Sequence, residues 1–233
     1  MSRVVLVAGA SRGIGLALAR ALRAEGAELF LCARPSERLD ALKTEFPGCV
    51  QGLDLRDEAA IGRWAGAHPV VDAYVHCAGD FFGGGSERLG AEQLRELFES
   101  NLLSAELGFA AVRERLRPRA GAALFFGTAG LESHRARRSS AAYSALKSAL
   151  LVMVRSWALE ESRHGVRVNL LSPGIVPHPD AEPSSLEPER QKALPLGRAA
   201  RMEEVVGAAR WLISERARYI TGVNLEVAGG WLS

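Results

Sequence analysis

Short apolar runs alternate with longer amphipathic stretches along the chain, and this alternation constrains the fold more than any other feature of the sequence. The apolar runs are rich in Val, Leu, Phe and Ala, and they lack the polar alternation of a strand with one face in water. We therefore predict strands buried on both faces, at residues 3–8, 27–33, 49–53, 71–76, 121–127, 166–171 and 223–227. Helical patterns lie between them, at about 13–25, 36–46, 57–66, 91–117, 141–164 and 202–214.

Repeated strand–helix units are typical of the α/β class. We predict a single Rossmann-type, doubly wound domain over residues 1–233, with a seven-stranded parallel sheet flanked by helices. The length of 233 residues, with 48% hydrophobic and 24% charged residues, suits a globular core and excludes collagen-like and disordered classes. Six prolines, the first Pro173 and the last Pro195, interrupt the pattern, so we expect an irregular substrate flap at about 175–195.

Charge and cysteine content exclude several functions. A net charge of +2 is too small to indicate a nucleic-acid partner. The three cysteines, Cys32, Cys49 and Cys77, form neither a disulfide framework nor a metal-binding pair, which predicts a cytoplasmic protein without a metal. No apolar run approaches the roughly 20 residues that span a bilayer, so we expect no membrane partner.

A glycine-rich turn follows the first predicted strand. Residues 9–15 read GASRGIG and lead directly into the first predicted helix. Glycines let the backbone turn sharply and approach a pyrophosphate, while the helix offers free N–H groups and the positive end of its dipole. A tight turn without a ligand is the alternative, but such a turn seldom needs three glycines. The turn therefore predicts a dinucleotide site.

The end of the second strand indicates which dinucleotide. An acidic residue there would bind a ribose 2′-hydroxyl and repel a 2′-phosphate, but this strand ends in Ala33 and is followed by Arg34. Arg34 and Arg12 together favour a 2′-phosphate through charge-assisted hydrogen bonds. We therefore predict NADP(H) rather than NAD(H). The alternative is that Arg34 is a solvated residue ahead of the second helix.

Tyr143 and Lys147 form the main catalytic pattern. Residues four apart share one face of a helix, and an ammonium lowers the pKa of a neighbouring phenol. Such a phenol gives a proton to a carbonyl oxygen as hydride reaches the carbon. The alternative is a chance pair on a surface helix. Lysine is scarce in this chain, where only Lys43 and Lys192 accompany Lys147.

These motifs together resemble the short-chain dehydrogenase/reductase family, in particular its NADP(H)-preferring carbonyl and 3-oxoacyl reductases. The resemblance extends from Val4 to Gly230 and includes the sequences FESNLL around Asn101 and NLLSPGIV at 169–176. It implies that Lys147 also binds the nicotinamide ribose, that Asn101 holds a water of a proton relay, and that Asp54 contacts the adenine.

The residue patterns and the resemblance together define the predicted site. The predicted catalytic residues are Tyr143, Lys147, Thr128 and Asn101. The predicted cofactor contacts are Gly9, Ser11, Arg12, Gly13, Ile14, Gly15, Arg34, Asp54, Leu55, Ala78, Gly79, Tyr143, Lys147, Pro173, Gly174 and Val176. For Asn101, an exposed helix position without a role is the alternative.

The chain departs from the family pattern at four positions. Thr128 stands where the family usually has a serine that holds the substrate carbonyl, and Ser133 is a second candidate for that hydroxyl. Cys77 replaces an asparagine, His178 replaces a threonine, and Ala228 replaces an aspartate. All four lie outside the Tyr143–Lys147 pair, so we still expect catalysis.

The predicted function is NADPH-dependent reduction of a ketone or aldehyde to an alcohol. Alternatives are alcohol oxidation, epimerisation or dehydration on the same fold, or a catalytically idle nucleotide-binding protein. Arginines in the loop 133–140 would attract an anionic or carrier-bound substrate, although a solvated basic loop is the favoured explanation, because arginine is the default cation of this chain. The resemblance also implies a homodimer or homotetramer.

Overall fold

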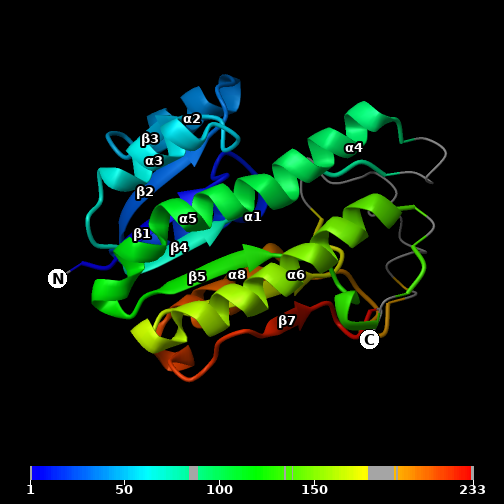
Figure 1. Ribbon diagram of the computed structural model, residues 1–233. Helices are drawn as coiled ribbons and strands as arrows, with labels where there is room; N and C mark the ends of the chain where they lie inside the picture. Colours follow the sequence, from blue (N-terminus) through cyan, green and yellow to red (C-terminus); the bar gives the residue numbers. More distant parts are fainter. Residues whose placement is uncertain are drawn as a thin grey trace.

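The computed structural model describes residues 2–83, 89–133, 135–137, 139–177, 192 and 194–231. Within this part of the chain, seven parallel strands form one sheet in the order β3-β2-β1-β4-β5-β6-β7 (Figure 1). The strands are β1 (Val4–Ala8), β2 (Glu28–Ala33), β3 (Val50–Gly52), β4 (Ala73–His76), β5 (Ala122–Phe126), β6 (Arg167–Pro173) and β7 (Asn224–Val227). The predicted seven-stranded parallel sheet is confirmed.

Helices cover both faces of the sheet. They are α1 (Gly13–Ala24), α2 (Glu37–Glu45), α3 (Glu58–Gly66), α4 (Ala91–Phe98), α5 (Ser104–Leu116), α6 (Ala141–Glu161) and α8 (Met202–Ile213). Short 3-10 turns lie at η3 (Arg117–Arg119), η4 (Leu131–Ser133), η5 (Ser162–His164) and η7 (Glu215–Ala217). None of the helices in the described ranges combines the length and apolarity needed to cross a membrane.

The core has two layers because side chains on a strand alternate between its faces. Leu6 and Phe125 point to one face, where they pack with Trp157 of α6 and with residues of α3 and α5. Val7 points to the other face and packs with Leu212 of α8 and with residues of α1 and α2. In Figure 1, α5 and α6 lie in front of the sheet, on the first of these faces.

The strand order places a crevice between β1 and β4. The chain runs outward from β1 to β3, and then returns to pair β4 with the other side of β1. The turns that leave β1 and β4 therefore diverge, which opens a ligand site at the carboxyl ends of these strands. Gly9 follows β1 with φ +82°, and a Cβ on it would lie 2.7 Å from the Ala78 nitrogen. Only glycine fits this contact.

The predicted continuous helix over 91–117 is wrong in its middle. A π-helical segment, η2 (Glu99–Leu103), separates α4 from α5. Ser100 Oγ donates to the Glu96 carbonyl over 2.7 Å, and Asn101 Nδ2 donates to the Leu97 carbonyl over 3.0 Å. These side chains compete for the carbonyls of the preceding turn, which favours a wider turn. The inserted turn lies beside the crevice.

Candidate active site

A cavity of about 1380 Å³ opens at the carboxyl end of the sheet. Every predicted cofactor contact lines it, although these residues come from the ends of five different strands, the segments that follow them, and α6. Three predicted catalytic residues, Tyr143, Lys147 and Thr128, line the same cavity. The residues predicted from the sequence therefore lie together around one cavity. This cavity is large enough for a dinucleotide together with a small substrate.

The glycine turn offers a place for phosphate. Helix α1 begins at Gly13, and its N-cap residue Arg12 makes no side-chain capping hydrogen bond to the first turn. Gly13 has φ +54°, and no atom lies within 4 Å of the position that a Cβ on it would take. The first turn of α1 thus lines the cavity with the positive end of the helix dipole, which fits a pyrophosphate.

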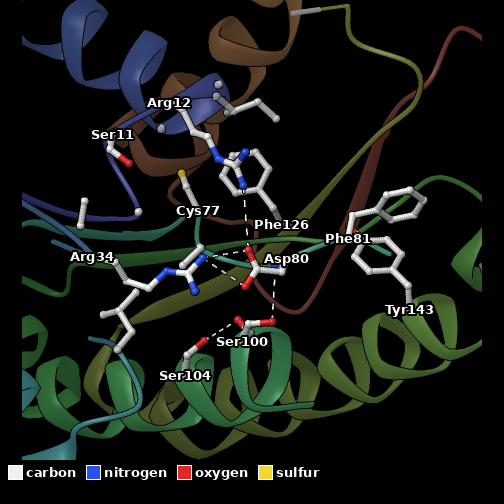
Figure 2. Close-up of a pocket in the computed structure, with 18 of the residues that line it drawn as sticks. Ser11, Arg12, Arg34, Cys77, Asp80, Phe81, Ser100, Ser104, Phe126 and Tyr143 are labelled. Atoms are coloured by element: carbon white, nitrogen blue, oxygen red, sulfur yellow. Dashed lines mark hydrogen bonds and ion pairs between the residues drawn. The ribbon is translucent and has the colours of Figure 1, made fainter. Parts of the chain in front are cut away.

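Arg12 and Arg34 converge, as predicted, but on a carboxylate that the sequence prediction missed. Arg34 Nη2 donates to both Asp80 carboxylate oxygens, over 2.9 and 3.2 Å, and Arg12 Nη2 lies 3.9 Å from one of them (Figure 2). Asp80 directly follows the predicted contacts Ala78 and Gly79. This position next to two predicted cofactor contacts is the sequence feature that could have indicated Asp80 as a site residue.

The end of β3 carries a second ion pair. The Arg56 guanidinium binds both oxygens of the Asp54 carboxylate, the shortest contact being 2.6 Å, and it also contacts Glu99 of η2 at 3.2 Å. Hydrogen bonds from the Arg56 side chain hold the pKa of Asp54 below its usual value. Asp54 is therefore a fixed anion at the edge of the cavity, and Arg56 is a lining residue that the sequence prediction missed.

Tyr143 and Lys147 lie one turn apart on α6, as predicted. Lys147 is buried, and its Nζ donates to the Phe126 carbonyl over 2.8 Å and lies 5.6 Å from the centre of the Tyr143 ring. Burial lowers the pKa of Lys147 to about 8. The expected fall in the tyrosine pKa is wrong for this structure, because burial raises the pKa of Tyr143 to about 12. The ammonium is directed at the strand carbonyl rather than at the phenol.

Asn101 is buried, with an exposed fraction of 1%, so the alternative of an exposed helix asparagine is excluded. Its Nδ2 donates to the Asp80 carbonyl over 2.9 Å, whereas its Oδ1 has no hydrogen-bond partner among the described residues. A Cβ on Gly79 would lie 2.5 Å from this Oδ1 and 3.5 Å from Lys147 Nζ. The free acceptor therefore lies close to the lysine, in a place that suits a bound water.

The two candidate hydroxyls lie in different surroundings. Thr128 lines the cavity, whereas Ser133 lies in η4, where its Oγ donates to the Gly130 carbonyl over 3.0 Å. Ser133 is absent from the described lining of the cavity, and Ser139 is present in it. Ser139, just ahead of α6, is a hydroxyl that the sequence prediction missed.

The basic loop has a structural contact. Arg137 Nη2 donates to the carbonyls of Ala129 and Gly130, over 3.0 and 2.7 Å, and so braces the turn after β5. Arg138, His178 and most of the predicted flap lie outside the described residues.

Two further contacts shape the far end of the cavity. Phe81 packs edge-on against Tyr143, with ring centres 5.0 Å apart, and it also lines the cavity (Figure 2). At the end of β6, three predicted cofactor contacts, Pro173, Gly174 and Val176, line the cavity. A Cβ on Gly174 would lie 2.9 Å from the Cα of Ala228, so glycine permits the close approach of the turn after β7.

Comparisons with known proteins agree with this geometry. The sequence model of a family described as enoyl-(acyl carrier protein) reductase matches residues 9–232. L-xylulose reductase from Bos taurus is 31% identical over 239 residues, covering 99% of this chain and 97% of the relative. A crystal structure of an oxidoreductase of the short-chain dehydrogenase/reductase family from Burkholderia thailandensis has a TM-score of 0.89 and 31% identity, covering 100% of this chain and 93% of that one.

A third similar protein carries a nucleotide. The blue fluorescent protein from a metagenomic library, solved in complex with NADPH, has a TM-score of 0.88 and 26% identity, covering 99% of this chain and 98% of that one. The family match spans six of the seven strands, β2 to β7, and the relative from Bos taurus covers 99% of this chain. The chain belongs to the short-chain dehydrogenase/reductase family, and it is an oxidoreductase.

Proposed function

We propose that the protein is an NADPH-dependent carbonyl reductase that converts a ketone or aldehyde to an alcohol within one catalytic domain. The observation that carries this proposal is the position of Tyr143 and Lys147, which line the same cavity as the glycine turn. A proton donor and a dinucleotide site in one cavity are what carbonyl reduction requires. The reductase named among the relatives supports the same direction.

Several described groups fit a bound NADPH, which would supply the hydride. The N-terminus of α1 suits the pyrophosphate, and the arginines Arg12 and Arg34 suit the 2′-phosphate. Asp54 would contact the adenine, and Lys147 would bind the nicotinamide ribose. The absence of an acid at Ala33, and the NADPH bound by a similar protein, support NADPH over NADH.

Tyr143 is the proposed proton donor. With its pKa raised to about 12, the phenol remains protonated at neutral pH, as proton donation requires. The Thr128 hydroxyl would donate a hydrogen bond to the same carbonyl oxygen and hold it in place. The Lys147 ammonium would stabilise the phenolate once the proton has left.

Asn101 has a proposed role in returning the proton. Its buried Oδ1 lacks a partner among the described residues, and Lys147 uses one of three donors on the Phe126 carbonyl. A water accepting from Lys147 and donating to Oδ1 would give the amide oxygen a partner and use a second donor of the lysine. Such a water would connect the phenol to solvent through the lysine.

Turnover over a panel of ketones, aldehydes and alcohols, followed through NADPH absorbance, tests the proposal. We expect carbonyl-dependent oxidation of NADPH, and a fall in kcat of about 10²- to 10⁴-fold in Tyr143→Phe with the NADPH Kd unchanged. Turnover of alcohols alone would instead support oxidation. Cofactor binding without any turnover would support an idle nucleotide-binding protein.

We also propose that the protein is a cytoplasmic homo-oligomer. Leu94 and Phe98 of α4, and Val152 and Leu159 of α6, are apolar side chains left exposed on the helices of one face. Exposed apolar side chains of this size favour association. All three cysteines are free thiols, which suits a reducing compartment. Light scattering after gel filtration would test the assembly, and a monomer at micromolar concentration would contradict it.

A further inference from the structure

Asp80 is held in place within the cofactor cavity. Its backbone N–H donates to Ser100 Oγ over 3.3 Å, and its carbonyl accepts from Asn101 Nδ2 over 2.9 Å. The π-helical segment η2 therefore fixes the residue from both sides of its backbone. The side chain has an exposed fraction of only 16%, and it points toward Arg12 and Arg34 (Figure 2).

The two arginines are the groups proposed to hold a 2′-phosphate, yet each already faces this carboxylate. Arg34 makes a two-oxygen contact with Asp80 at 2.9 and 3.2 Å, and Arg12 lies at 3.9 Å. Both arginine side chains are about half exposed, whereas Asp80 is largely enclosed. The carboxylate is thus the fixed member of the cluster, and the guanidinium groups are the members with room to move.

A carboxylate in this place opposes a 2′-phosphate in two ways. It occupies guanidinium donors that the phosphate requires, and it repels the phosphate because both groups are negative. An acid at the end of β2 would have the same effect on a 2′-phosphate, but that strand ends in Ala33. Asp80 brings a negative charge to the cavity from the turn after β4 instead.

We propose that Asp80 is a specificity-determining residue that limits the preference of this enzyme for NADPH over NADH. The carboxylate acts as an internal counter-ion of Arg34 and Arg12, and a 2′-phosphate must displace it from them. This inference rests on the proposed function, since it concerns the same nucleotide site. It adds a residue that weakens the phosphate selectivity that the arginines create.

Binding of two nucleotide fragments isolates the effect of the 2′-phosphate without any turnover. Adenosine 2′,5′-bisphosphate carries this phosphate and 5′-AMP lacks it, and calorimetry on the whole protein measures both Kd values. In Asp80→Asn we expect roughly five- to tenfold tighter binding of the bisphosphate, because one opposing charge and one ion pair are removed. Binding of 5′-AMP should change less than about twofold.

Asp40→Asn is the matched control. Asp40 lies on α2, its side chain is exposed, and it pairs with Lys43 at 3.9 Å. The substitution removes the same charge from the protein but does not alter the cavity lining, so the ratio of the two Kd values should stay as in the wild type. A change equal to that of Asp80→Asn would overturn the proposal, because the effect would then reflect net charge alone.

A double-mutant cycle tests whether Asp80 weakens bisphosphate binding through its ion pair with Arg34. In an Arg34→Ala background, Asp80→Asn should improve bisphosphate binding by less than half as much, since the main competing pair is already absent. Asp80→Ser replaces Asp80→Asn if circular dichroism shows that the asparagine variant is unfolded.

The outcomes separate the inference from the proposed function. Weaker or unchanged bisphosphate binding in Asp80→Asn overturns the inference, since Asp80 would then hold Arg34 in its binding position or have no influence. The proposed function survives that result if wild-type protein binds NADPH. Failure of the wild type to bind either NADPH or NADH overturns the proposed function and the inference with it.

Discussion

Lys147 donates a hydrogen bond from Nζ to the main-chain carbonyl of Phe126, the last residue of β5, over 2.8 Å. This contact joins α6 to the carboxyl end of an interior strand, where the cavity opens. The ammonium is buried, so it loses solvation, and its pKa falls to about 8. The charge of this lysine therefore changes within a pH range where the folded protein can be measured.

The buried lysine predicts a specific pH dependence of stability. Its pKa is about 8 in the folded protein and 10.5 ordinarily, so the unfolded chain binds more protons between these values. The free energy of unfolding therefore rises with pH across this window, by up to about 3 kcal/mol. Lys147→Met should remove this rise. Urea unfolding of both proteins at about pH 7.5 and about pH 9.5 measures the free energy of unfolding at each pH. An equal change between the two pH values in the wild type and in Lys147→Met would contradict the assignment.

Thr128, rather than Ser133, should hold the substrate carbonyl. Thr128→Val removes the hydroxyl at nearly constant shape, and we expect kcat to fall about a hundredfold. Thr128→Ser keeps the donor and should retain most of the activity. Ser133→Ala serves as the matched control, because Ser133 bonds to the Gly130 carbonyl outside the cavity lining. A larger loss in Ser133→Ala than in Thr128→Val would reverse the assignment.

His76 should make the fold sensitive to acid. It is buried, with ring nitrogens 2.9 Å from Tyr74 Oη and 3.2 Å from Ser104 Oγ, and burial lowers its pKa to about 3. The unfolded chain then binds more protons below about pH 6.5, so stability falls as the pH falls. Between about pH 6.5 and 4.5 we expect a loss of about 2 kcal/mol from this residue.

His76→Asn separates that effect from the loss of the hydrogen bonds. The variant should be less stable at neutral pH, because Tyr74 and Ser104 lose a buried partner. Its stability should nevertheless decline less steeply with acid than that of the wild type. Chemical unfolding at several pH values measures both quantities, and parallel acid profiles would rule out the histidine as the cause.

Glu161 should contribute more to stability than its sequence neighbour Glu160. Glu161 has an exposed fraction of 1% and accepts hydrogen bonds from Arg113 and Arg117, over 2.9 to 3.0 Å. We expect Glu161→Gln to lower the free energy of unfolding by about 2 kcal/mol. Glu160→Gln is the control, since its side chain is 53% exposed and such pairs contribute about 0–1 kcal/mol. Equal effects of the two substitutions in urea unfolding would refute the difference.

Most of the fold follows from local pattern. Each predicted strand overlaps an observed one, because strands buried on both faces leave a continuous apolar run that is visible in any short window. The helix predicted over 91–117 contained the main error. Its π-helical turn arises from side-chain hydrogen bonds to the preceding carbonyls, and hydrophobic periodicity does not register those bonds.

Most residues of the site could be predicted from the sequence, but the carboxylate that pairs with its arginines could not. The glycine turn and the Tyr143–Lys147 spacing are local patterns, so they can be read without a structure. Asp80 and Phe81 belong to the site because the turn after β4 brings them against Arg34 and Tyr143, which are distant in the chain. Contacts of that kind depend on the strand order.

Local residue order was thus sufficient for the parallel sheet, the family and the positions of the reactive groups, since each depends on spacing within one strand, turn or helix. The ionisation of those groups required the folded arrangement. A pKa depends on which atoms surround a group after distant segments pack, and here packing raises the pKa of Tyr143 and lowers that of Lys147. The same packing places the Asp80 carboxylate between two arginines at the proposed phosphate site.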